Sequence, residues 1–306
     1  MGEKQKEWRD RQKYTTKFSV IIPMKDTEKH IMDALNSVKA QNYNNCEILV
    51  INDHSRDSSK EIVQKYIDNN KDLDIKLFEV KDGKWGPGAG RNVGLDNATG
   101  EYVMFLDSDD ELREESLKRL DEAIKNNNML DVFLLGHTMY TLDDKGQEKR
   151  KITFNPKKFQ TTKLFQMGIN TGGTIWQGCW KRELFEKNHI RFDENCIFED
   201  TTARLQLYGK ANKIKIAGVN THNYFVRPGN SICTTQTKEH LKASIEMARR
   251  VSRLVKEGKV DKKYQKYVTT RLLVMPGCLA WVLYCMGEYK MYQHRHKNEM
   301  KQIEDK

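Results

Sequence analysis

The chain has 306 residues, which is enough for one large domain or for a domain with an appendage. Its 53 Lys and Arg outnumber 43 Asp and Glu, and the net charge of +10 favours anionic partners such as phosphate-bearing substrates, nucleic acid or anionic lipid surfaces. The six cysteines include no Cys-x-x-Cys pair, which argues against a zinc site or a disulfide framework and suits a reducing, cytoplasmic compartment.

Neither end of the sequence predicts a membrane-spanning helix or a signal peptide. Residues 1–17 are polar and charged throughout, so we expect residues 1–16 to form a tail. The longest apolar run, Leu272 to Gly287, is interrupted by Pro276 and Gly277. It is shorter than the ~20 residues that a transmembrane helix needs.

From residue 17 onward, short apolar runs alternate with stretches of helical periodicity. The predicted strands are Phe18–Pro23, Glu47–Ile51, Ile75–Val80, the run from Gly100 to Leu106, and Asp131–Gly136. The predicted helices between them are Glu28–Gln41, Ser58–Asn69, Arg91–Ala98 and Glu114–Asn126. This alternation predicts an α/β fold with a doubly wound, mostly parallel sheet flanked by helices.

After residue 136 the alternation of predicted strands and helices becomes less regular. We expect a hairpin over Met139–Phe154, short helices over Lys163–Gly168 and Arg182–Asn188, and strands over Lys213–Ala217 and His222–Val226. Helical periodicity runs from Lys238 to Gly258 and resumes at Lys262, so residues 17–237 are the predicted main domain and 238–306 a helical C-terminal region. That region could pack on the main domain, form a homo-oligomer, or contact a membrane peripherally through its basic tail, and the sequence leaves all three open.

Three carboxylates, Asp107, Asp109 and Asp110, follow the predicted strand that ends at Leu106. Such a cluster is costly because like charges repel and burial disfavours them, and a divalent cation bound to a phosphate would remove that cost. The alternative is that Asp109 or Asp110 only caps the next helix. Asp53 and the Gly-rich loop 81–90 also follow strand ends, so we expect all these residues to share one crevice, where such sheets bind ligands.

Several motifs, in order, carry a specific resemblance. They are Ser19-Val20-Ile21-Ile22-Pro23, Val50 to Asp57 (VINDHSRD), Gly90 to Leu95 (GRNVGL), Gly100-Glu101-Tyr102, Phe105 to Asp110 (FLDSDD) and Glu199-Asp200. With these motifs the stretch from Lys17 to Ser231 resembles the family 2 glycosyltransferases of GT-A fold. The resemblance implies a metal-dependent, inverting transfer of a sugar from a UDP-sugar donor to an acceptor hydroxyl. It points to a glycan or lipid-linked acceptor, as in bacterial cell-surface polysaccharide synthesis.

The resemblance also implies donor-binding residues. Asp53 would bind the nucleoside beside Pro23, and Arg91 would lie close to the donor diphosphate. In the Asp-x-Asp segment, Asp109 would coordinate Mn²⁺ or Mg²⁺, and Asp107 would contact the ribose or a metal-bound water. Ser108 belongs to the same donor-binding segment. For Asp53 the alternative is that it only caps the following helix.

On the acceptor side, Asp200 matches the general base of the family, and Glu199 would orient it or the acceptor, although an acidic pair before a helix is often only a cap. The segment from His222 to Ser231 resembles the region that closes over the diphosphate. There Arg227 would pair with phosphate, and His222 would be either a third metal ligand or a structural residue. Trp176 would either stack on a sugar or lie buried.

Two other functions are weaker. A nucleotidyltransferase shares this kind of sheet and metal site, but a Gly-rich loop usually follows its first strand, and Pro23 to Thr27 has no glycine. A nucleic-acid-binding or scaffold protein is suggested only by the charge, and no binding module is recognisable, so we expect no nucleic-acid partner.

Overall fold

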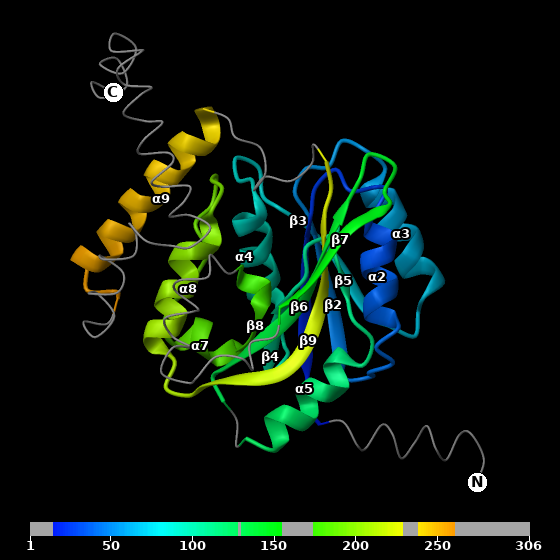
Figure 1. Cartoon of the computed structure of the whole chain (residues 1–306), viewed down its shortest axis with the longest axis horizontal. Coiled ribbons are helices and arrows are strands. Elements are labelled where there is room, and N and C mark those ends of the chain that lie inside the picture. The colour runs from blue at the N-terminus through cyan, green and yellow to red at the C-terminus, as the bar shows by residue number, and fades with distance from the viewer. Residues whose placement is uncertain (1–14, 128–129, 155–173, 229–237, 261–306) are drawn as a thin grey trace. The chain divides into compact units, whose positions relative to one another are not determined.

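The computed structural model describes residues 15–127, 130–154, 174–228 and 238–260 (Figure 1). The chain divides into two compact units, and the described part of the second contains the helix α9 (Lys238–Lys256), within the stretch predicted to be helical. The predicted tail up to residue 14, the helix Lys163–Gly168 and the helical stretch from Lys262 lie outside the described residues. Among the helices that are described, none combines the length and the apolar character needed to cross a bilayer.

The first unit is built on one mixed sheet. Its described strands are β1 (Phe18–Met24), β2 (Cys46–Asn52), β3 (Asp74–Glu79), β4 (Tyr102–Phe105), β5 (Glu111–Leu112), β6 (Val132–Leu142), β7 (Glu148–Phe154), β8 (Gly178–Lys181) and β9 (Ile214–Val226). Their order is β3-β2-β1-β4-β8-β6-β9-β5, with β7 paired to β6. Strands β3, β2, β1 and β4 are parallel, and β8 is antiparallel to both of its neighbours, so the predicted parallel sheet forms the N-terminal half.

Helices cover both faces of this sheet (Figure 1). They are α2 (Ile31–Lys39), α3 (Ser59–Asn69), α4 (Pro87–Asn97), α5 (Ser116–Lys125), α7 (Arg182–Lys187) and α8 (Glu199–Lys210), with a short 3-10 helix η2 (Ile175–Gln177). Buried residues of α2, α3 and α5 share one hydrophobic core with β1, β2 and β4. On the other side α4 packs against β1 and β2. Because β1 and β2 are buried on both faces, their sequences are nearly continuous runs of apolar residues.

Several predicted boundaries differ from the structure. The strand predicted over Asp131–Gly136 and the first arm of the predicted hairpin form one strand, β6. The segments predicted as two strands near residues 213 and 222 form one long strand, β9, which is interrupted only in its register with β6 around Gly136. Helix α4 begins at Pro87, inside the predicted Gly-rich loop, because proline suits the first turn of a helix. The early start brings the loop glycines into the helix that packs on β1.

The hydrogen bonds of Glu47, a fully buried carboxylate on β2, hold the sheet to the start of β4. Its carboxylate accepts hydrogen bonds from Ser19 Oγ (2.6 Å) and from Thr99 N (2.6 Å), and Lys76 Nζ lies 3.3 Å away. Desolvation alone would raise the pKa of Glu47, but these bonds outweigh it and lower the pKa to about 2. The ionised form therefore stabilises the folded chain.

We predict that Glu47→Gln lowers the free energy of unfolding by about 1–3 kcal/mol at pH 7, because a buried hydrogen-bonded anion is replaced. The pKa is depressed in the folded state, so this contribution is present above pH ~4.5, the ordinary value, and is lost as the pH falls towards ~2. Urea unfolding of both proteins at pH 7 and pH 4 measures the difference. Glu61→Gln, at an exposed position of α3, is the control. An undiminished difference at low pH would contradict the assignment.

Candidate active site

Polar residues gather where parallel strands end. In the register of the sheet, Met24 of β1 pairs with Asn52 of β2, and Ile21 pairs with Phe105 at the end of β4. Parallel neighbours present their carboxyl ends at the same edge, so the segments after β1, β2 and β4 lie along one edge of the sheet. The structure thus brings Asp53 and the Asp-x-Asp segment to the same side of the first unit.

Asp53 carries a carboxylate oxygen that the described part of the chain does not satisfy. Its side chain is almost fully buried, and Oδ2 accepts the backbone N–H of Gly86 (2.8 Å) with Lys25 Nζ at 3.4 Å. Oδ1 is buried and has no hydrogen-bond partner among the described residues. A buried acceptor left in this state is costly, so the position is suited to a ligand N–H or hydroxyl. Asp53 is not the N-cap of α3, which is Ser58.

Glycine is required where the loop meets Asp53 and the opposite segment. Gly86 has φ of +90°, a conformation that residues with a Cβ rarely adopt, and in it the backbone N–H reaches Asp53. At Gly88 a Cβ would lie 2.0 Å from the carbonyl oxygen of Asp193. At Gly90 a Cβ would lie 3.0 Å from Pro23 Cβ, so Pro23 borders the same loop. The glycines therefore allow the loop backbone to lie close to the segments that contain Pro23 and Asp193.

Arg91 is buried between two carboxylates. It is 5% exposed, its Nη2 lies 2.8 Å from Asp107 Oδ1, and its Nη1 pairs with Glu199 Oε1. Its guanidinium also lies over the ring of Phe192 at 5.7 Å. Arg91 thus connects the Asp-x-Asp segment to α8, and its place close to the donor diphosphate stays a prediction.

The three aspartates after β4 have different environments. The side chains of Asp107 and Asp109 are 33% and 42% exposed, whereas Asp110 is 2% exposed and accepts the backbone N–H of Phe225 (2.9 Å). Ser108, between the first two, is buried. Strand β5 separates Asp110 from α5, whose N-cap is Glu115, so the helix-cap interpretation of Asp109 or Asp110 is wrong.

Acidic groups raise one another's pKa here. Desolvation by the surrounding protein and the Asp107 carboxylate raise the pKa of Asp109, partly opposed by Arg227. Burial, and then Asp109 and Asp107, raise the pKa of Asp110 well above its ordinary value. Arg227 lies at this cluster: its Nη1 donates to the Asp109 backbone oxygen (2.7 Å) and lies 3.6 Å from Oδ2. A cation at Asp107 and Asp109 would relieve the remaining repulsion.

His222 is not presented as a metal ligand. It is 1% exposed, Nδ1 lies 2.8 Å from Thr221 Oγ1, and Nε2 lies 3.1 Å from the carbonyl oxygen of Phe105. Burial lowers its pKa to about 4. Both ring nitrogens thus face protein atoms, which favours the structural alternative for His222. The same is true of Trp176, which is 3% exposed and packs against the ring of His222 at 5.1 Å.

Across the described residues, no group of three or more His, Cys, Asp or Glu is arranged to hold a metal ion. The two exposed carboxylates still fit a hard divalent cation, because Mg²⁺ and related ions are often bound by one or two carboxylates together with substrate phosphates. Asp107 and Asp109 are therefore the residues that could hold a metal.

Glu199 and Asp200 open α8 and point to different partners. Glu199 is buried on Arg91, and burial raises its pKa while Arg91 opposes the shift. Asp200 is half-buried, and its Oδ2 accepts the backbone N–H of Ile175 (3.1 Å). The helix N-cap is Phe198, in a left-handed conformation with no side-chain cap. Glu199 is thus occupied by its ion pair with Arg91. Asp200 is the carboxylate of the two that could act on a substrate.

Sequence reasoning missed the loop that joins the two halves of the site. Two hydrogen bonds join Trp85 and Asn195: Trp85 N donates to Asn195 Oδ1 (2.8 Å), and Asn195 N donates to Trp85 O (3.0 Å). Next to them, Lys84 Nζ forms an ion pair with Glu194 at 2.8 Å. Asn195 adopts a φ of +59°, which asparagine tolerates better than most residues. No feature of the sequence around Trp85 predicts a hydrogen-bond partner 110 residues away.

Known proteins resemble this chain in sequence and in fold. Residues 19–188, more than half of the chain, match the description Glycosyl transferase family 2. Glycosyltransferase GlyA of Streptococcus pneumoniae is 28% identical over 79% of this chain and 35% of its own length. The poly(ribitol-phosphate) beta-N-acetylglucosaminyltransferase TarS of Staphylococcus aureus is 32% identical over 68% of this chain and 35% of its own. The chain thus spans about a third of the length of these relatives.

Solved structures agree with the fold. TarS residues 1–349 in complex with UDP-GlcNAc superpose with a TM-score of 0.63 at 25% identity, over 82% of this chain and 69% of that one. A Pyrobaculum calidifontis mannosyltransferase in complex with GDP-Man and Mn²⁺ has a TM-score of 0.56 at 15% identity, a likeness of fold alone, over 92% of this chain and 82% of that one. The mixed sheet with its edge of acidic strand ends has the GT-A fold, and the chain belongs to the family 2 glycosyltransferases.

Proposed function

We propose that this glycosyltransferase moves a sugar from a UDP-sugar to an acceptor hydroxyl, with a divalent cation and with inversion at the anomeric carbon. The observation that carries the donor assignment is the buried, unsatisfied Oδ1 of Asp53 at the sheet edge that also presents Asp107 and Asp109. A uracil N–H or a ribose hydroxyl would satisfy that oxygen. TarS is described in complex with UDP-GlcNAc, so UDP-GlcNAc is the first donor to test.

Asp109 would hold Mn²⁺ or Mg²⁺ directly, with Asp107 beside it. When bound, the cation would neutralise charge on the departing diphosphate. Arg227 adds a fixed positive charge at Asp109, and it is the arginine best placed to approach a phosphate, since Arg91 is held between two carboxylates. Preorganised positive charge of this kind is usually the largest contribution to catalysis.

Asp200 would act as the general base. The acceptor oxygen forms a bond to the anomeric carbon, the bond from that carbon to the diphosphate oxygen breaks, and the acceptor proton passes to Asp200. The hydrogen bond from Ile175 N fixes one oxygen of Asp200, which leaves the other for the acceptor. A single displacement inverts the anomeric centre, and Glu199 contributes by anchoring the first turn of α8 to Arg91.

A nucleotidyltransferase is the alternative. It would use the same acidic strand end, but it would release pyrophosphate or consume it. The family assignment favours sugar transfer. A glycan or lipid-linked acceptor and a place in bacterial cell-surface polysaccharide synthesis are our proposals, and they rest on the sequence resemblance alone. A cytoplasmic location, peripheral membrane contact and self-association stay predictions from the sequence.

We predict that UDP with Mn²⁺ raises the melting temperature of the wild-type chain by about 5–10 °C at a hundredfold excess over Kd. Asp109→Ala should abolish the part of the shift that depends on Mn²⁺, because it removes the carboxylate assigned to the cation. Asp68→Ala, an exposed aspartate on α3, is the matched control and should keep the full shift. If UDP and Mn²⁺ do not change the melting temperature of the wild-type chain, the proposed donor class is refuted.

We predict that Asp200→Asn keeps the UDP and Mn²⁺ shift but loses about 10²–10⁴-fold in sugar transfer, the usual contribution of a general base. Release of UDP from UDP-glucose, UDP-galactose and their N-acetyl forms, with and without acceptor sugars, provides the measurement. Asp68→Asn again serves as the control. Near-normal turnover of Asp200→Asn would show that another group takes the proton.

A further inference from the structure

Trp85 is the most exposed of the large apolar side chains that the structure describes. It is 45% exposed, compared with 39% for Met32 and 37% for Ile152. Within the described part of the chain, neither an aromatic ring nor a cation contacts its indole. A single exposed apolar side chain needs no explanation in itself. The backbone on either side of Trp85, however, joins it directly to the candidate site.

The peptide bond after Trp85 connects two segments of the site. Its carbonyl oxygen accepts from Asn195 N (3.0 Å), and its nitrogen, which belongs to Gly86, donates to Asp53 Oδ2 (2.8 Å). The carbonyl oxygen and the N–H of a trans peptide point in opposite directions, so Asp53 and Asn195 lie on opposite sides of this bond. The backbone of Trp85 therefore lies between the carboxylate that follows β2 and the segment that precedes α8.

Hydrogen bonds also fix the backbone before Trp85. Its own N–H donates to Asn195 Oδ1 (2.8 Å), and the carbonyl oxygen of Lys84 lies 3.2 Å from His54 Nε2. Lys84 Nζ in turn pairs with Glu194 at 2.8 Å. The exposed ring thus stands on a backbone that is already held in place, so a ligand that packs on the ring orders little besides the indole itself.

The unsatisfied oxygen of Asp53 indicates what kind of ligand this is. Oδ1 is buried without a partner among the described residues, while Oδ2 is bound by Gly86. The nitrogen that donates to Oδ2 is bonded to the carbonyl carbon of Trp85, so the indole and the open acceptor are close neighbours. A nucleobase matches both features, because it has an N–H on its edge for a carboxylate and flat faces that stack on an aromatic ring.

The other described segments that contact Asp53 provide no comparable flat surface. The segment after β1, Met24 to Thr27, contains no aromatic residue, and its Lys25 Nζ lies 3.4 Å from Asp53 Oδ2. His54, the residue after Asp53, is turned toward the carbonyl oxygen of Lys84. The indole of Trp85 is therefore the flat apolar surface that these segments offer to a base.

We propose that the indole of Trp85 stacks on the nucleobase of the donor nucleotide while Asp53 Oδ1 accepts an N–H from the edge of the same base. That the nucleotide is a UDP-sugar rests on the proposed function. Trp85 is then a binding residue that sets the affinity for the nucleoside, and it takes no part in the displacement at the anomeric carbon. Its removal should raise KM for the donor and leave kcat unchanged at saturating donor.

Three ligands separate the parts of the donor. Titration calorimetry in the presence of Mn²⁺ measures Kd for UDP-GlcNAc, for UDP and for pyrophosphate, which has no base. We expect Trp85→Ala to weaken the binding of UDP-GlcNAc and of UDP by the same factor, about tenfold or more, the usual effect of losing one base–aromatic stack. Pyrophosphate should bind as tightly as before.

Two further substitutions test whether a flat ring is what matters. Trp85→Phe retains an aromatic ring and should keep most of the affinity for UDP, whereas Trp85→Leu retains apolar bulk alone and should resemble Trp85→Ala. The indole also reports directly on stacking. UDP should quench part of the tryptophan fluorescence of the wild-type chain, and Trp85→Phe, which still binds UDP, should lose that quenching.

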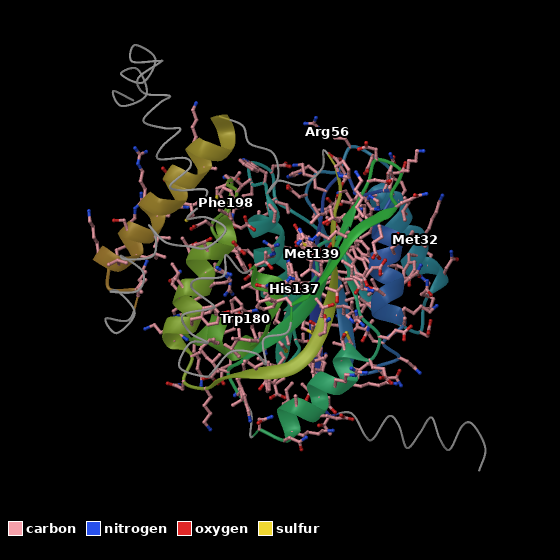
Figure 2. All side chains as sticks on the ribbon, in the orientation of Figure 1. Met32, Arg56, His137, Met139, Trp180 and Phe198 are labelled. Carbon is pink, nitrogen blue, oxygen red and sulfur yellow. The ribbon has the colours of Figure 1, made fainter. Side chains whose placement is uncertain are left out.

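Met32→Ala is the matched control. Met32 lies on α2 and is 39% exposed, so this variant also loses a large exposed apolar side chain (Figure 2). Its affinities for the three ligands should equal those of the wild-type chain. Without ligand, Trp85→Ala and Met32→Ala should both melt close to the wild-type temperature, because neither side chain belongs to the core.

Three results would overturn the inference while UDP still binds the wild-type chain and the proposed donor class stands. They are equal UDP affinity in the wild-type chain and in Trp85→Ala, a loss confined to UDP-GlcNAc, which would place the ring on the donor sugar, and an equal loss for pyrophosphate, which would indicate a general effect on the site.

Two other results bear on the donor class itself. If GDP or ADP binds the wild-type chain and UDP does not, and Trp85→Ala loses that binding, the proposed donor class is wrong and the stacking role stands, because every base has a flat face. If none of the three nucleotides binds the wild-type chain, both are overturned.

Discussion

The buried ion pairs of Arg91 hold the site together. Its guanidinium, from α4, lies between Asp107 after β4 and Glu199 at the start of α8. The pair with Glu199 is buried, and removing one member of a buried ion pair leaves an uncompensated charge, which is strongly destabilising. Three elements far apart in the chain are therefore locked in one arrangement.

This arrangement couples the two chemical halves of the enzyme. Asp109 follows Asp107 by two residues, and Asp200 follows Glu199 directly, so the bridge through Arg91 sets how the proposed metal ligands lie relative to the proposed base. The loop contacts between Trp85 and Asn195 add a second connection, from the backbone that donates to Asp53 to the segment before α8. The residues proposed for donor and acceptor are thus positioned by the same set of contacts, as the proposed displacement would require.

The ribbon formed by β6, β7 and β9 places positive charge on aromatic rings near the acidic cluster. Lys151 Nζ lies 4.9 Å from the Tyr140 ring and Arg227 Cζ lies 5.0 Å from the Phe225 ring, and Arg227 also reaches Asp109. Cation–π pairs of this kind contribute only about 0.5–1 kcal/mol each at exposed sites, so their value lies in placing charge.

The alternation of strands and helices up to residue 136, the acidic strand end and the family could be predicted from the sequence, because apolar periodicity and closely spaced motifs are local. The partners of Arg91, His222 and Trp176 could not. Arg91 pairs with Glu199, 108 residues further along the chain, and His222 lies against Phe105, 117 residues earlier. Such distant partners decide whether a side chain is available to a ligand or is bound by other protein groups. The unsatisfied oxygen of Asp53 is likewise a property of burial and hydrogen bonding, which arises only when distant segments pack together.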